Sequence, residues 1–390
     1  MRILHAFNDY LPATMNWAGN IITHTPAAEL FVAAARFLKT NFFFSNITYV
    51  EFPLREGEWN STSRFAALAD RGVRLARRLA YPRLLKARIG DVDILHSHFA
   101  TAGWNFRQFA QALGARHVVS FYGYDYEKVP QSHPAWRDRY RIIFEQADMF
   151  LCEGEHGAKA LCSLGAPAKK VRVCPLGILP ERIVPVRRKK DRAALKLLQV
   201  ATYVEKKGHI YALRAFAMAC RECPGMQLVF VGSARDAEGA EIMESLRRES
   251  VSAGISDRVS FAPAVPYEAL YELFSDFHVF IHPSTYSRDR DCEGGAPIVL
   301  LDAQASGMPV IATRHCDIPG EVVHGTTGLL SAERDVDTLA AYIRRFYDMD
   351  QVEYDRFAHA ARTHVEAAFD VKDNAKQLRA LYEEVCANPR

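Results

Sequence analysis

The sequence predicts an α/β protein built from two doubly wound (Rossmann-like) parallel sheets that face a central cleft. Short apolar runs alternate with helix-length segments along most of the 390-residue chain. This pattern is typical of parallel strands joined by crossover helices. A stretch rich in proline and basic residues interrupts the alternation near the middle of the chain. The length also suits two domains, since a domain typically has about 100–200 residues.

The apolar runs give the candidate strands in order, and only the stretch 20–45 is ambiguous between helix and strand. The strands of the first half are expected at 2–7, 47–52, 92–98, 116–121, 149–153 and 171–175, and those of the second half at 195–203, 227–232, 258–263, 278–283 and 309–313.

The interruption "LPERIVPVRRKKDRAALK" lacks an apolar period and divides the chain. We therefore predict an N-terminal domain at 1–180, a linker at 181–194 and a C-terminal domain at 195–368. Residues 369–390 form a last helix that can cross back to the N-terminal domain. In such sheets, ligands bind outside the carboxyl ends of the strands.

Composition restricts the class of protein further. The net charge of +3 is too small to indicate nucleic-acid binding, and no apolar run approaches the roughly 18 residues of a membrane span. The N-terminus reads as a strand rather than a signal peptide. The eight cysteines show no paired metal or disulfide spacing, which favours a reducing, cytoplasmic setting.

The segment "CEGGAPIVLLDAQ" combines two acids with a glycine pair before a predicted helix. Gly294 and Gly295 leave amide groups uncovered at the positive end of the helix dipole, which favours an anion. Glu293 suits sugar hydroxyls, and Asp302 on the helix, about two turns in, suits a ribose diol. The alternative interpretation is a glycine-entered helix with solvated acids.

Two further segments place polar side chains at strand ends. In "VEKKGH", Lys207 stands before a glycine after a strand and suits a diphosphate, although a solvated lysine pair is the simpler interpretation. In "DILHSHF", His98 ends a strand and points into the cleft, with His96 deeper on the same face. Tyr122 and Asp125 of "FYGYD" follow the next strand and share that rim. No third ligand completes a metal site with the two histidines.

These segments together resemble a known family. "HVFIHPS", "EGGAPIVLLDAQASGMPVIAT" and "EVVHGTTGLL" are similar to motifs of the retaining nucleotide-sugar glycosyltransferases of family 4, which have the GT-B fold. The similarity extends over nearly the whole chain and is strongest from about 195 to 332. It implies that residues 1–180 bind the acceptor and residues 195–368 bind the donor.

The resemblance also assigns roles to residues. Glu293 matches the acid that contacts the transferred sugar, Asp302 the acid on the ribose, and Lys207 the lysine on the diphosphate. His98 matches the active-site histidine, and Gly19 in "MNWAGN" falls where the family has an N-terminal glycine loop near the phosphates. The expected catalytic residues are His98, Glu293 and Lys207, the expected donor-binding residues are Gly19, Thr202, Lys207, Glu293, Gly294, Gly295, Ala296 and Asp302, and Tyr122 and Asp125 are expected on the acceptor side.

The implied reaction moves a hexose-type sugar from a nucleoside diphosphate to a glycan or lipid-linked acceptor in polysaccharide biosynthesis, with retention and without a metal or other cofactor. This sequence departs from the family pattern in four places. Asp302 replaces the usual Glu, one extra residue separates the two acids, Thr202 stands where the family has Arg, and Tyr122 stands where relatives often have His.

Two other functions remain open. A GT-B-fold nucleotide-sugar epimerase would need a base for proton removal, and no spare carboxylate near the cleft is evident. The missing arginine at Thr202 favours a catalytically inactive nucleotide-sugar-binding subunit of a polysaccharide assembly complex.

Residues 64–88 carry eight basic residues and one acid, with leucines at intervals. This pattern predicts an amphipathic basic helix that contacts anionic lipid at the inner face of the membrane, or equally a solvated helix face.

Overall fold

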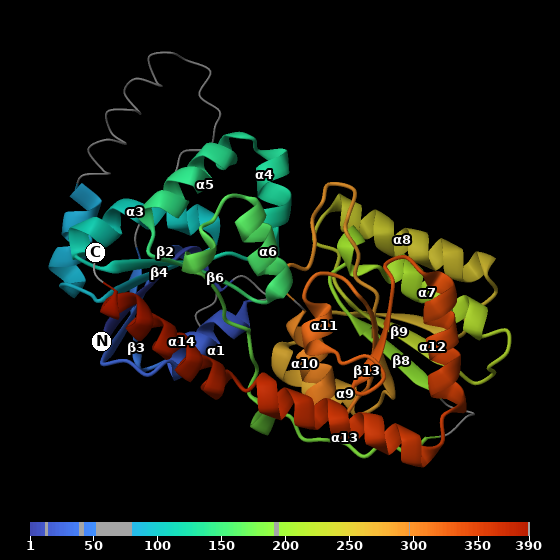
Figure 1. Ribbon diagram of the computed structural model, residues 1–390. Coiled ribbons are helices and arrows are strands. Elements are labelled where there is room, and N and C mark those ends of the chain that lie inside the picture. Colours follow the sequence, from blue (N-terminus) through green and yellow to red (C-terminus); the bar gives the residue numbers. More distant parts are fainter. Residues whose placement is uncertain (12–14, 39–42, 52–79, 191–194, 296, 389–390) are drawn as a thin grey trace.

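The computed structural model describes residues 1–11, 15–38, 43–51, 80–190, 195–295 and 297–388, and it confirms two parallel sheets (Figure 1). The N-terminal sheet has seven strands in the order β3-β2-β1-β4-β5-β6-β7, and the C-terminal sheet has six in the order β10-β9-β8-β11-β12-β13. All neighbouring strands are parallel. The strand that comes first in the chain, β1 or β8, lies inside its sheet. The chain adds strands on one side of it and then on the other, as in doubly wound folds.

The strands of the N-terminal sheet are apolar because helices cover both faces. Helices α1 and α14 pack on one face, whereas α3 and the helical residues 80–89 pack on the other. The elements are β1 (Arg2–Tyr10), α1 (Asn16–His24), β2 (Glu29–Phe37), β3 (Ile47–Glu51), β4 (Ile94–His98), α3 (Ala100–Leu113), β5 (Arg116–Ser120), the π-helical turn Tyr124–Lys128, α4 (Val129–Ser132), α5 (Ala135–Gln146), β6 (Met149–Cys152), α6 (Glu155–Ser163) and β7 (Val171–Val173).

The C-terminal sheet is built in the same way. Helices α7, α8 and α12 pack on one face, and α9 and α10 pack on the other. The elements are β8 (Lys196–Val200), α7 (His209–Ala219), β9 (Gln227–Gly232), α8 (Ala237–Ser252), β10 (Val259–Pro263), α9 (Leu270–Phe274), β11 (Val279–His282), α10 (Ile298–Ala305), β12 (Val310–Thr313), α11 (Ile318–Glu321), β13 (Gly328–Ser331), α12 (Val336–Asp348), α13 (Gln351–Ala368) and α14 (Val371–Ala387).

The chain crosses between the two sheets twice, and the two crossings lie side by side. The amide of Ile178 donates to the carbonyl of Phe369 at 3.0 Å, and the amide of Val371 donates back to the carbonyl of Ile178 at 2.8 Å. After the second crossing, α14 packs beside α1 and contributes Leu378 and Tyr382 to the N-terminal core (Figure 1).

Two strands were not predicted. The ambiguous stretch 20–45 contains the end of α1 and all of β2, because the apolar residues of the helix run into those of the strand with little polar spacing. Strand β13 has the sequence GLLS, in which only Leu329 and Leu330 are apolar, so no apolar run marks it. Within the described residues, no helix combines the length and apolarity that crossing a membrane requires.

The segment predicted as a linker contains one buried cation. Arg188 is 4 % exposed, and its guanidinium donates to the backbone carbonyls of Phe274, Phe277 and Ser306. It also donates to the Ser306 hydroxyl at 2.9 Å. Arg188 therefore ties this segment to the C-terminal domain through the ends of α9 and α10.

We expect Arg188→Met to destabilise the C-terminal domain by about 3 kcal/mol or more, because buried carbonyls would lose charge-assisted hydrogen bonds. The matched control is Arg187→Met, since the Arg187 side chain is 81 % exposed and should contribute little. Urea unfolding followed by circular dichroism measures both variants. Equal midpoints would contradict the anchoring role of Arg188.

Candidate functional site

Loops at the carboxyl ends of the two sheets meet directly. Gly123 follows β5, and Gly294 lies in the loop before α10. A Cβ atom on Gly123 would collide with the backbone of Gly294. Gly294 has φ +81°, a conformation that side chains other than glycine rarely adopt. The two glycines therefore let the domains approach to backbone contact beside the predicted acid–glycine motif.

Glu293 is a buried carboxylate with several donors. The Lys207 ammonium lies 2.6 Å from its Oε2, and the Ser284 hydroxyl donates to Oε1 at 2.9 Å. His282 Nε2 lies 3.4 Å from Oε1. Burial opposes ionisation, but the charge of Lys207 and the contact with His282 outweigh it and hold the pKa of Glu293 well below its ordinary value. Glu293 is therefore ionised at neutral pH.

Lys207 is placed by the turn between β8 and α7. Gly208 after it has φ +65°, and a Cβ there would collide with the carbonyl oxygen of Pro283 at the end of β11. The Gln199 amide donates to the Lys207 carbonyl at 2.7 Å. The close approach of the two strand ends thus brings Lys207 against Glu293, although they are far apart in sequence.

The predicted anion site carries an unexpected partner. The amide of Gly295 donates to the Glu153 carboxyl at 2.6 Å, and Glu153 follows β6 of the other domain. Burial raises the pKa of Glu153 to about 8, even though the Gly295 amide opposes this shift. Sequence analysis missed Glu153, since a single acid after a strand gives no pattern. Ala296, the third predicted amide donor, lies outside the described residues.

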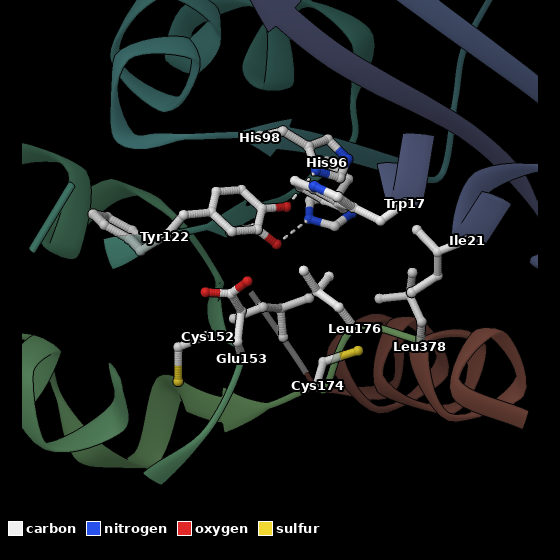
Figure 2. Close-up of a pocket in the computed structure, with 13 residues that line it drawn as sticks. Trp17, Ile21, His96, His98, Tyr122, Cys152, Glu153, Cys174, Leu176 and Leu378 are labelled. Atoms are coloured by element: carbon white, nitrogen blue, oxygen red, sulfur yellow. Dashed lines mark hydrogen bonds between the residues drawn. The ribbon is translucent and has the colours of Figure 1, made fainter. Parts of the chain in front are cut away.

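A pocket opens next to Glu153 on the N-terminal side (Figure 2). Trp17, His98 and Tyr122 line it together with Glu153. Both ring nitrogens of His98 have partners: the Tyr122 hydroxyl lies 2.9 Å from Nδ1, and His5 Nδ1 lies 3.0 Å from Nε2. His98 therefore lies at the predicted wall of the cleft, but it reaches the pocket mainly through Tyr122.

His96 was predicted to lie deeper than His98, but both residues line the same pocket and both are 2 % exposed. His96 contacts the Tyr382 hydroxyl of α14 at 2.6 Å and the Ser120 hydroxyl at 2.7 Å. Burial, reinforced by the neighbouring histidines, holds the pKa values of His96 and His98 well below the ordinary value. Both imidazoles are consequently neutral at neutral pH.

Two of the predicted residues, Gly19 and Asp125, have surroundings that the sequence did not indicate. Gly19 lies inside helix α1 and faces Phe44 and Tyr10, so it is not part of a glycine loop. Asp125 is fully buried and accepts the Tyr122 amide at 3.0 Å instead of lining an open rim.

Asp302 is the fifth residue of α10, about one turn in rather than two. It is 1 % exposed and accepts the Tyr267 hydroxyl at 2.8 Å. Burial raises the pKa of Asp302 to about 7. Thr202 lies in the turn after β8, partly exposed, near the position of Lys207.

Comparisons with known proteins agree with this arrangement. The family model described as glycosyl transferases group 1 matches residues 184–364, and the model described as glycosyltransferase family 4 matches residues 52–182. The first range contains all six strands of the C-terminal sheet, and the second contains β4 to β7 of the N-terminal sheet.

Relatives of similar sequence act in polysaccharide biosynthesis. The chain is 26 % identical over 295 residues to the amylovoran biosynthesis glycosyltransferase AmsK of Erwinia amylovora, covering 75 % of this chain and 70 % of the relative. It is 27 % identical over 296 residues to the putative colanic acid biosynthesis glycosyltransferase WcaL of Salmonella typhimurium, covering 75 % and 71 %.

Solved structures share the fold over almost the whole length. Anabaena Alr3699/HepE in complex with UDP and glucose superimposes with a TM-score of 0.72 at 16 % identity, covering 98 % of this chain and 99 % of the other. Sucrose-phosphate synthase from Thermosynechococcus elongatus gives 0.76 at 21 % identity, with 99 % of each chain covered.

The fold and the matched family models together define a two-domain GT-B glycosyltransferase. The chain belongs to glycosyltransferase family 4.

Proposed function

We propose that the protein transfers a hexose-type sugar from a nucleoside diphosphate to a glycan or lipid-linked acceptor, with retention of anomeric configuration and without a catalytic metal. The observation that carries this proposal is the ionised Glu293 beside Lys207, next to the Gly295 amide and opposite the pocket of the other domain. The relatives that act in polysaccharide biosynthesis support a glycan-type acceptor.

On the donor side, Lys207 and the Gly294–Gly295 amides would stabilise the charge that develops on the leaving diphosphate. Lys207 needs little rearrangement, because it already lies at the edge of the cleft. Asp302 would accept the ribose hydroxyls after Tyr267 turns away from it. Glu293 would orient the sugar through its hydroxyls and is not assigned as a covalent nucleophile.

On the acceptor side, the Tyr122 hydroxyl offers a polar contact to an incoming sugar, and the Trp17 ring offers an aromatic one. His98 would act as a positioning residue, because its Nδ1 holds the Tyr122 hydroxyl. The donor phosphate would then help to remove the acceptor proton on the same face of the sugar, which gives retention.

The test is transfer from UDP- and GDP-hexoses to sugar and lipid-linked acceptors, with the product anomer read by NMR. We expect Glu293→Gln to lower kcat by about 10- to 100-fold, which corresponds to losing one charge-assisted contact of about 1.5–3 kcal/mol in the transition state. His98→Asn should lower kcat by about tenfold or less, because the neutral imidazole makes an uncharged hydrogen bond of about 0.5–1.5 kcal/mol to the Tyr122 hydroxyl. Affinity for free UDP or GDP should stay nearly unchanged. The exposed Glu238→Gln serves as the matched acid control.

The outcomes separate the rival functions. Nucleotide-sugar binding with neither transfer nor donor hydrolysis would indicate an inactive binding subunit. Release of a new sugar isomer without acceptor would indicate an epimerase. Loss of UDP and GDP binding in either variant would mean that the donor lies in the opposite orientation.

Glu153 gives this site a pH dependence. Below its pKa of about 8 the Glu153 carboxyl is neutral, whereas above it a carboxylate competes with the diphosphate for the Gly295 amide and repels it. We expect the affinity for UDP or GDP to fall by up to about tenfold per pH unit above that pKa, because binding then takes up one proton. Calorimetry should show this fall in Glu155→Gln, an exposed neighbour, but not in Glu153→Gln. An unchanged profile in Glu153→Gln would contradict this role.

We also propose that residues 64–88 contact an anionic membrane at its cytoplasmic face, where lipid-linked acceptors would be met. Residues 64–79 lie outside the described residues; of the remainder, Leu85 is buried and Leu84 is 58 % exposed. Each basic residue near an anionic leaflet adds about 1 kcal/mol.

Co-sedimentation with vesicles tests this contact. We expect binding to anionic vesicles at low salt, none to neutral ones, and release as salt screens the charges. Replacing Arg74, Arg77 and Arg78 by Gln should weaken binding more than replacing the exposed Arg141, Arg187 and Arg248. Equal loss in both triple variants would make the contact non-specific.

A further inference from the structure

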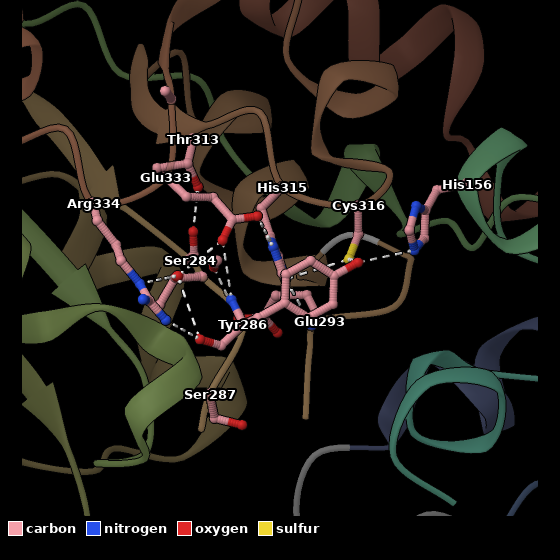
Figure 3. A network of polar contacts seen from close by, with 12 residues as sticks. His156, Ser284, Tyr286, Ser287, Glu293, Thr313, His315, Cys316, Glu333 and Arg334 are labelled. Atoms are coloured by element: carbon pink, nitrogen blue, oxygen red, sulfur yellow. Dashed lines mark hydrogen bonds and ion pairs between the residues drawn. The ribbon is translucent and has the colours of Figure 1, made fainter. Parts of the chain in front are cut away.

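Two cysteines and a histidine lie close together beside Glu293. One ligand atom from each of Cys292, His315 and Cys316 falls within 4.8 Å of the other two. Cys292 is buried, and so is His315, while Cys316 is partly exposed. Figure 3 shows His315 and Cys316 side by side at the centre of a polar network.

The backbone brings these side chains together from two loops. Cys292 lies in the loop between β11 and α10, and the other two follow β12. Cys316 has φ +47°, which is uncommon for a residue other than glycine. This conformation lets two consecutive residues turn their side chains to the same point, since Cys316 Sγ lies only 3.3 Å from His315 Nε2. Strained backbone of this kind is characteristic of functional sites.

His315 is held in the orientation of a metal ligand. Its Nδ1 lies 2.7 Å from the Glu333 carboxylate, so Nδ1 carries the proton. Nε2 is then the acceptor, and it lies 3.2 Å from the Glu293 amide and 3.3 Å from Cys316 Sγ. Metal-binding histidines almost always donate their other ring N–H to a carboxylate or carbonyl in this way. The Thr285 hydroxyl donates to Glu333 at 2.9 Å.

We propose that Cys292, His315 and Cys316 bind one structural zinc ion. Zinc bonds of about 2.3 Å to sulfur and 2.0–2.1 Å to nitrogen place tetrahedral ligands roughly 3.5–3.8 Å apart. His315 Nε2 and Cys316 Sγ lie 3.3 Å apart, and all three ligand atoms lie within 4.8 Å of one another, so small side-chain shifts would complete the site. Two soft sulfur ligands and one imidazole favour zinc over magnesium or calcium.

His156 of the N-terminal domain lies beside the site without being one of its ligands. Its Nε2 lies 3.4 Å from the Tyr286 hydroxyl and 3.1 Å from Glu127. The Cys316 thiol donates to the same Tyr286 hydroxyl at 3.8 Å, so this hydroxyl lies between the cluster and His156.

A second cluster, formed by His5, His96 and His98, is a weaker candidate. Both ring nitrogens of His96 and of His98 already have hydrogen-bond partners, whereas Nε2 of His5 has none among the described residues. That cluster also lacks a sulfur or carboxylate ligand.

The ion would act on the loop and not on the sugar. Glu293 follows Cys292 directly, and its amide donates to His315 Nε2 at 3.2 Å. Zinc would replace the Glu293 amide as the partner of His315 Nε2. Its bond to the Cys292 sulfur would fix the residue that precedes Glu293. The site goes beyond the proposed sugar transfer and stands whether or not that function holds.

The first test measures zinc in the full-length protein, purified under reducing conditions and loaded with zinc before gel filtration. We expect about one zinc per chain by elemental mass spectrometry. Cobalt loading should give thiolate-to-metal charge transfer and the intense visible bands of tetrahedral cobalt. Cys292→Ser and Cys316→Ser should each lose these signals, whereas Cys162→Ser, at an exposed cysteine outside the cluster, should keep them.

A second measurement needs no variant. Zinc should protect the wild-type Cys316 and Cys292 thiols from alkylation, mapped by peptide mass spectrometry, while the exposed Cys162 and Cys386 react at the same rate with or without zinc. Any of three results would overturn the proposal: zinc content equal in wild type and both variants, cobalt bands without thiolate charge transfer, or a Cys292–Cys316 disulfide that forms equally fast in the presence of zinc.

Discussion

The structure around the cleft depends on compensating one buried negative charge. An ionised carboxylate as enclosed as Glu293 would cost several kcal/mol without a partner, and Lys207 supplies that partner at 2.6 Å. Bringing Lys207 there requires Gly208 in a left-handed conformation against the end of β11. The neighbouring Lys206 contributes as well, since its ammonium donates to the Cys292 carbonyl at 2.8 Å. The ends of β8 and β11, the turn at Gly208 and the loop that carries Glu293 are therefore held together by the same charges.

The same loop sets how the domains approach each other. Because Gly123 and Gly294 touch through their backbones, no side chain separates the two halves of the cleft there. Glu153 then reaches across to the Gly295 amide, and Asp317 reaches in the other direction to the amide of His156 at 2.7 Å. Each domain thus provides a carboxyl group for backbone amides of the other, which keeps the contact polar and easily exchanged for a ligand.

The sequence predicted the fold well, because strands that are buried on both faces consist of uninterrupted apolar runs. It failed at β2, where α1 and the strand share one apolar stretch, and at β13, where only two leucines are apolar. For the candidate site, the local motifs selected Glu293 and Lys207, which the structure brings together, and His98, which lines the pocket of the N-terminal side. Their roles remain predictions.

What the sequence could not supply were partners that arise only when distant loops meet. Glu153 meets the Gly295 amide across the domain boundary, Asp302 is covered by Tyr267, and Cys292 meets Cys316 from the next loop. Local spacing carries no signal for such contacts. The family resemblance also misled the interpretation of Gly19, which lies inside α1, where Phe44 and Tyr10 leave little room for a side chain.

Helix α14 imposes an order on how the polypeptide matures. The N-terminal core needs Leu378 and Tyr382, which the ribosome makes after every strand of both sheets, so this domain cannot complete its interior until α14 has been synthesised. The C-terminal sheet, in contrast, ends at Ser331 and is closed by α12 and α13 before α14 emerges. The N-terminal domain is therefore made first and completed last. Until α14 packs on it, the apolar face that α14 covers is open to a chaperone.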